Sequence, residues 1–93
     1  MFKNKKTYNQ LERFVRGFSN HRRIQIMELL KKEPELSVEE IAEELDVNMK
    51  TIAQHIKRLA MSGLVLKRCE LHSVRHKLTK KGIQVLKFLR TLE

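Results

Sequence analysis

The chain has 93 residues, a length that suits one domain with a modest hydrophobic core. It carries 20 Lys and Arg against 11 Asp and Glu, for a formal net charge of +9, and contains one Cys. A single Cys excludes an intrachain disulfide and fits a reducing compartment, and no apolar run approaches the ~20 residues of a membrane helix. We therefore expect a cytoplasmic protein without a signal peptide or a membrane span.

The first third of the sequence predicts two helices after a polar, frayed segment at residues 1–6. Over residues 7–17, apolar side chains recur at intervals of three and four, which is typical of an amphipathic helix. Asn20 can cap a second helix over residues 21–33, and Pro34 would end it. The side chains of the second helix that we expect in the core are Ile24, Ile26, Met27 and Leu30.

Residues 37–63, SVEEIAEELDVNMKTIAQHIKRLAMSG, predict two short helices joined by a tight turn. Ser37 opens an S-x-x-E capping box for the first, acidic helix. Asn48 can cap the second helix, over residues 49–62, and Gly63 supplies a left-handed stop. A short helix followed by a cationic one is typical of a helix-turn-helix, whose second helix enters the DNA major groove.

The last third predicts a β-hairpin and a closing helix. Residues 64–69 and 74–78 alternate as strands do, and the tip between them contains neither Gly nor Asn, which favours a loop longer than two residues. Thr79 can cap a helix over residues 80–92, whose apolar stripe is broader than one small core requires. The expected fold is mainly α with a small hairpin: a winged helix-turn-helix in one domain over residues 1–93.

The helix over residues 49–62 separates an apolar face from a polar one, because its Ile and Leu residues share one side at 100° per residue. On the other side, Gln54 can pair with adenine, Lys50 can reach guanine, and Ala53 is small enough for close approach. These three residues are candidates for contacts to DNA base edges. A solvated amphipathic helix is the alternative for the same pattern.

Basic and polar side chains beside that face are candidates for contacts to DNA phosphates. Residues 48–93 carry eleven basic and two acidic side chains, whereas residues 35–47 carry six acidic and none basic, a distribution that favours a nucleic-acid partner. An edge hairpin also uses Lys to prevent aggregation, which is the alternative for the strands. The candidates are Thr51, His55, Lys57, Arg58, Lys67, Arg68, Arg75 and Lys77.

The best candidates for metal ligands in the sequence are Cys69, His72 and His76. They fall on a hairpin, where side chains alternate between faces, and no fourth ligand is close, whereas zinc prefers a closed set of four. The sequence also contains no Gly-rich phosphate loop and no nucleophile motif. We therefore expect no metal, no cofactor and no enzymatic activity.

Three segments carry a family resemblance: NHRRIQIMELL at residues 20–30, the helix-turn-helix with the residues that follow it at 37–65, and VRHKLTKKG at residues 74–82. Together they resemble the ArsR-like winged-helix transcriptional regulators, although related groups such as MarR share the central segment. The resemblance implies contacts to DNA bases from the start of the recognition helix. By position these contacts fall on Met49, Lys50, Ala53 and Gln54.

The resemblance also implies a homodimer formed by the first and last helices. Metal-sensing members place Cys-x-Cys where Ser37 and Glu39 stand here, or Asp and His on the last helix, which has neither. His21 replaces the usual Pro, and the hairpin tip lacks the usual Gly. The apolar residues that the resemblance places at the dimer interface are Tyr8, Leu11, Phe14, Val15, Phe18, Val85, Phe88, Leu89 and Leu92.

The function expected from these features is transcriptional regulation by a homodimer that binds double-stranded DNA sequence-specifically. Repression is favoured because no activation segment is visible. The alternative is a winged-helix module that binds another protein, or nucleic acid without sequence preference. A sensor with a small-molecule pocket at the dimer interface is a third reading, for which the sequence names no effector.

Overall fold

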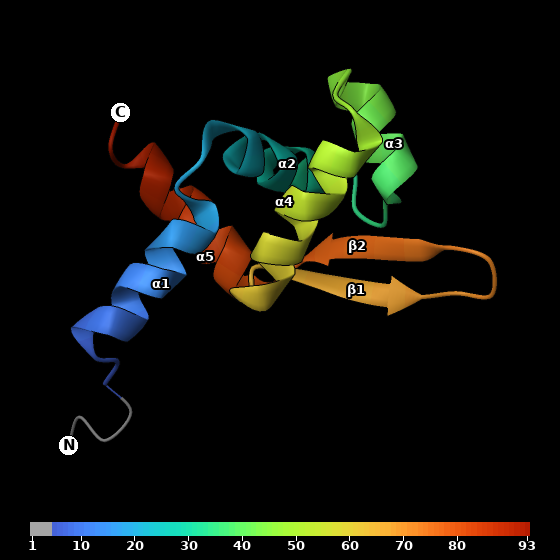
Figure 1. Cartoon of the computed structure of the whole chain (residues 1–93). Helices are drawn as coiled ribbons and strands as arrows, with labels where there is room; N and C mark the ends of the chain where they lie inside the picture. The colour runs from blue at the N-terminus through green and yellow to red at the C-terminus, as the bar shows by residue number, and fades with distance from the viewer. Residues whose placement is uncertain (1–4) are drawn as a thin grey trace.

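The computed structural model describes residues 5–93, which form five helices and a two-stranded antiparallel hairpin (Figure 1). The elements are α1 (Tyr8–Phe18), α2 (His21–Lys32), α3 (Val38–Leu45), α4 (Met49–Met61), β1 (Val65–Cys69), β2 (Val74–Leu78) and α5 (Lys80–Arg90). This order confirms the winged helix-turn-helix fold. The predicted fraying concerned residues 1–6, of which 1–4 lie outside the described residues.

Local signals set the helix boundaries. Ser37 and Glu40 form the predicted capping box of α3, and the Asn48 side chain accepts hydrogen bonds from the first turn of α4. Thr79 caps α5 in the same way, and Gly63 has the left-handed φ of 74° that ends α4. Two helices end earlier than predicted: α2 ends at Lys32 instead of residue 33, and α5 ends at Arg90 instead of residue 92.

Apolar side chains from all five helices and both strands form one core, to which α1 contributes Phe18 and the other elements mainly aliphatic residues. Among the expected residues of α2, Ile26, Met27 and Leu30 are buried, whereas Ile24 is only half-buried. Leu29, which was not expected, is buried as well. The reason is that α2 packs against several elements at once, including β2, α4 and α5, so a wider face is covered than one periodic stripe would predict.

The hairpin is attached to the α2–α3 connection through His76. The backbone N–H of His76 donates to the Leu36 carbonyl (3.0 Å), and its ring Nδ1 donates to the same oxygen (2.9 Å). The Glu35 N–H donates to the His76 carbonyl (2.9 Å), so residues 35–36 pair with β2 through a short antiparallel β-bridge. His76 is only 1% exposed, and this burial lowers its pKa in spite of the Leu36 hydrogen bond.

Lowering the pH is expected to destabilise the fold through His76. Its folded-state pKa lies below the ~6.5 of an unfolded chain, so its contribution is complete above about pH 6.5 and is lost as the pH falls through the folded value. The free energy of unfolding is measured by urea titrations at several pH values. Its decrease toward low pH should be smaller in His76→Asn than in the unaltered protein. The exposed His72 supplies a matched control, and His72→Asn should keep the original dependence. Identical pH dependence in His76→Asn and the unaltered protein would contradict this role.

Candidate nucleic-acid interface

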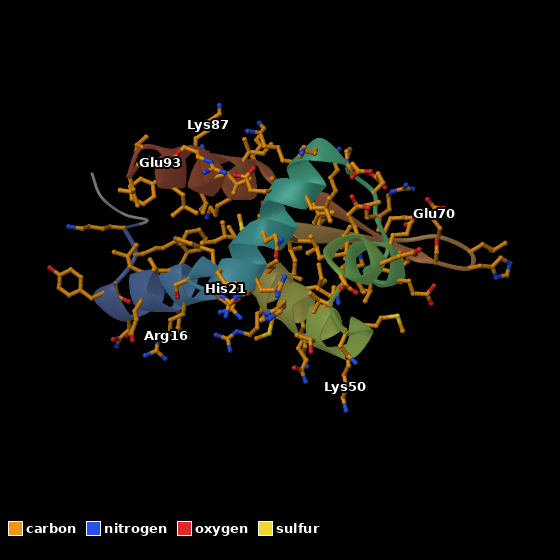
Figure 2. The ribbon with its side chains drawn as sticks, turned by 90° about the horizontal axis from the view of Figure 1, so that it is seen from above. Arg16, His21, Lys50, Glu70, Lys87 and Glu93 are labelled. Carbon is orange, nitrogen blue, oxygen red and sulfur yellow. The ribbon has the colours of Figure 1, made fainter. Side chains whose placement is uncertain are left out.

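The exposed face of α4 carries the residues predicted to contact bases. Ile52, Ile56 and Leu59 are buried and hold the helix on the core, so the opposite face points into solvent. All four predicted base contacts are exposed: Met49, Lys50, Ala53 and Gln54. Figure 2 shows Lys50 projecting from α4 away from the body of the molecule. The structure thus presents these four residues on one surface, in the first half of a capped helix.

A groove borders this surface on the hairpin side. Its volume is about 750 Å³, and it is open to solvent. The starts of α3 and α4 form two of its walls, and residues 72–75 at the end of the hairpin form the third. Glu39 and Glu40 line it together with Lys50 and Arg75, so this flank of α4 has mixed charge.

Two of the predicted phosphate contacts on the hairpin are engaged within the protein. The Arg68 guanidinium pairs with Glu35 (2.6 Å) and Glu70 (2.8 Å), and its pKa is raised by these carboxylates, Glu35 foremost. The Arg75 guanidinium pairs with Glu40 (2.6 Å). These pairs lie at the surface, partly accessible to solvent, and contribute little to stability, but a DNA phosphate would have to compete with them. Lys67 and Lys77 are exposed and make no ion pair among residues 5–93.

On the other flank of α4, Arg23 of α2 contacts His55. Its Nη1 donates to His55 Nδ1 (3.3 Å), and its Nη2 donates to the Arg16 carbonyl (3.0 Å). A guanidinium only donates, so His55 accepts through Nδ1 and is neutral in this contact. Burial first, and then the Arg23 charge, lower the pKa of His55. His55, also predicted as a phosphate contact, is therefore half-buried and held by Arg23, whereas Thr51, Lys57 and Arg58 are exposed.

Sequence reasoning did not name Arg22 or Arg23 as part of this surface. Arg23 lies 32 positions before His55, so no local spacing links them. The available signal was Asn20, whose side-chain oxygen accepts from the Arg22 and Arg23 backbone N–H groups and places both residues in the first turn of α2.

The residues predicted at the dimer interface lie on α1 and α5, at the end of the molecule away from the hairpin tip (Figure 1). Phe18 and Val85 are already buried in the core, and Phe14 and Leu89 are half-buried. The remaining five are exposed: Tyr8 (87%), Leu11 (44%), Val15 (46%), Phe88 (56%) and Leu92 (66%). An apolar groove of about 380 Å³ runs between α1 and α5 among these residues. We call this surface the α1/α5 face.

Cys69 and His72 are exposed on the hairpin, whereas His76 is buried, so the three do not converge. Within residues 5–93, no three His, Cys, Asp or Glu side chains gather as metal ligands would. Nor does that part of the chain contain a helix with the length and hydropathy needed to cross a bilayer.

A helix-turn-helix followed by a hairpin and a closing helix defines a winged helix-turn-helix DNA-binding domain of the kind found in transcriptional regulators. The HTH domain family matches residues 22–84, more than half of the chain, and the chain belongs to this family. No protein of curated function matched the sequence.

Solved structures agree with this assignment. One is the homodimeric winged helix-turn-helix DNA-binding domain of Mb0332 from Mycobacterium bovis, a possible ArsR-family transcriptional regulator; it is 26% identical, with a TM-score of 0.81 over 90% of this chain and 78% of that one. HlyU from Vibrio cholerae is 29% identical, with a TM-score of 0.77 over 99% and 97% of the two chains. The transcriptional regulator HlyU from Vibrio vulnificus is also 29% identical, with a TM-score of 0.73 over 90% and 88%. These similarities confirm the ArsR-like resemblance of the sequence.

Proposed function

We propose that this protein is a homodimeric transcriptional repressor in the cytoplasm that binds a pseudo-palindromic site in double-stranded DNA. Two α4 helices would enter successive major grooves about one turn (~34 Å) apart, with the hairpins beside the flanking phosphates. Bound in this way, the dimer would block access to the DNA sterically. The observation that carries the proposal is the exposed, capped first half of α4, which presents Lys50 and Gln54 to solvent on a fixed helix.

The α1/α5 face supports the dimer. Five large apolar side chains are exposed on these two helices or just beyond α5, and three of them, Leu11, Val15 and Phe88, line one groove. A monomeric protein seldom leaves such a patch uncovered. The related M. bovis domain is homodimeric. A second copy, related by a two-fold axis, would cover the same residues on both partners and bring two recognition helices into one assembly.

Base reading is assigned to the four exposed residues at the start of α4. The amide of Gln54 can bond both the N6 and N7 positions of an adenine, and the Lys50 ammonium can reach guanine O6 and N7. Neither side chain makes a hydrogen bond within residues 5–93, so both are available for DNA. Ala53 and the thioether of Met49 add apolar contact, for example to a thymine methyl group.

Replacing Gln54 tests this assignment. Gln54→Ala should cost ~1–3 kcal/mol on the cognate site and leave binding to unrelated DNA nearly unchanged, because only the base contact is lost. Binding of the two duplexes is compared at fixed salt. For contrast, Lys67→Ala should weaken binding on all sequences alike and lower the salt slope by about one. An unchanged base preference in Gln54→Ala would remove Gln54 from the reading surface.

The same apolar face would also suit a different protein, and a basic winged helix can bind nucleic acid without sequence choice. These are the competing functions. Equal, strongly salt-dependent binding to every duplex would favour the second of them. Absence of DNA binding together with a stable complex to another protein would favour the first.

A further inference from the structure

A basic surface lies on the side of α4 that faces α2. It comprises the start of α2 and the adjacent side of α4, and we call it the α2 flank. Figure 2 shows His21 between Arg16 and Lys50, on the side of the molecule away from Lys87 and Glu93. A cavity of about 480 Å³ opens there. The residues of the α2 flank are His21, Arg22, Arg23, His55, Lys57 and Arg58.

The cations of the α2 flank lack carboxylate partners. The ion pairs within residues 5–93 hold Arg16, Arg68, Arg75 and Arg90, and none includes a residue of this flank. The hairpin differs, because Glu35, Glu40 and Glu70 neutralise two of its four predicted phosphate contacts. The free positive charge beside α4 is therefore greater on the side of α2.

These cations also oppose one another. Burial and the Arg58 charge both lower the pKa of Arg23, and the buried Arg23 Nε has no hydrogen-bond partner within the described residues. Arg22, Arg23 and His21 together disfavour a charged His55. A cluster of like charges without counterions is relieved when an anion binds among them.

The position of the cluster identifies the anion. Around α4, the hairpin-side groove is lined by Met49, Lys50 and Ala53, whereas the cavity of the α2 flank is lined by Gln54, Lys57 and Arg58. The four residues proposed to read bases therefore border both sides: Met49, Lys50 and Ala53 border the hairpin-side groove, and Gln54 borders the cavity of the α2 flank. A helix in the major groove, which is about 12 Å wide, has a phosphate backbone along each of its sides.

We infer that the α2 flank is a second phosphate-binding surface, in which Arg22 and Arg58 bind the DNA backbone on the side of the major groove opposite the hairpin. This inference rests on the proposed function and adds Arg22, from outside the helix-turn-helix, to the DNA contacts. Arg23 positions the surface, because it joins the end of α1 to α4.

The test measures duplex binding of Arg22→Ala and Arg58→Ala at several salt concentrations. Each variant should weaken binding to all sequences several-fold and lower the slope of log K against log salt by about one. Lys32→Ala is the matched control, because it removes the same charge from an exposed position at the other end of α2. Its slope should equal that of the unaltered protein. Thermal melting of each variant verifies the fold.

Variants with slopes equal to that of Lys32→Ala would overturn the inference while leaving the proposed function intact. A free anion could supply the same phosphate chemistry as the DNA backbone. To distinguish the two, inorganic phosphate is titrated at constant ionic strength while the His55 ring signals are followed by NMR. Phosphate binding that Arg58→Ala abolishes, with the DNA slope unchanged, would assign the surface to free anions and also overturn the inference. If the unaltered protein binds no duplex at any salt concentration, the proposed function fails and the inference fails with it.

Discussion

Phe88→Glu is expected to convert the proposed dimer into a monomer and to weaken DNA binding by two orders of magnitude or more. Phe88 is 56% exposed and lines the α1/α5 groove with Leu11 and Val15. In a two-fold dimer each substitution acts twice. About half of the 1.5–3 kcal/mol for full burial is lost per Phe88 side chain, because the remainder of the ring is already covered in the monomer, and a carboxylate is placed in an apolar contact. A monomer also loses the 10²–10⁴-fold gain from binding two linked half-sites.

Sedimentation equilibrium measures the dimer, and titration of a two-half-site duplex measures the binding. Leu71→Glu is the control for the oligomeric state, because Leu71 is 92% exposed at the hairpin tip, outside the α1/α5 face. This variant should remain dimeric. If Phe88→Glu stays dimeric at the same concentrations, the dimer is formed by another surface.

The second large effect is expected at Gly82, in the first turn of α5. A Cβ atom there would lie 2.5 Å from the Leu64 carbonyl oxygen and 2.6 Å from Leu78 Cδ1. The carbonyl has little freedom to move, because it accepts a hydrogen bond from the Thr79 N–H (3.1 Å). The steric cost should exceed the ~1 kcal/mol that Ala gains over Gly in a helix.

We therefore expect Gly82→Ala to lower the free energy of unfolding by about 2 kcal/mol and the Tm by roughly 8–16 °C, since about 4–8 °C accompany each kcal/mol in a domain of this size. Thermal unfolding followed by circular dichroism provides the measurement. Gly63→Asn is the comparison, because a side chain at Gly63 meets open space and Asn tolerates its left-handed φ. A Tm for Gly82→Ala as high as that for Gly63→Asn would show that α5 can move aside.

The elements that sequence reasoning placed correctly depend on local signals. Helix boundaries are set by residues within one helical turn of each other, so they can be recognised in the sequence. Examples are the capping box at Ser37, the Asn48 cap and the Gly63 stop. The apolar spacing of α4 likewise fixed which side of the helix would be exposed. The base-contact surface was therefore predictable as a surface, although its contacts with DNA remain a prediction.

The parts that could not be predicted depend on contacts between distant residues. Arg68 and Arg75 looked equivalent to Lys67 and Lys77 in the sequence, but the α2–α3 connection and α3 bring carboxylates against the two arginines alone. The same connection covers His76 through Leu36, 40 positions away. The contact between Arg23 and His55 could not be predicted from the sequence, because only the packing of α2 on α4 brings the two residues together.

The placement of charge has a consequence for how the domain would bind. The hairpin side of α4 mixes cations with carboxylates, while the α2 side has cations alone. Attraction of DNA phosphates would thus be unequal on the two sides of the recognition helix, and affinity would depend strongly on salt. Sequence preference would come from the four base-reading residues at the start of α4, Met49, Lys50, Ala53 and Gln54.

The most direct test of this account is duplex-DNA binding over several salt concentrations, comparing the DNA upstream of the protein's own gene with a scrambled duplex of equal length. A sequence-specific dimer should prefer the upstream DNA by ~10³-fold or more at physiological salt, with one dimer bound per site. Equal affinity for both duplexes, or no binding to either, would contradict a sequence-specific regulator acting on its own promoter.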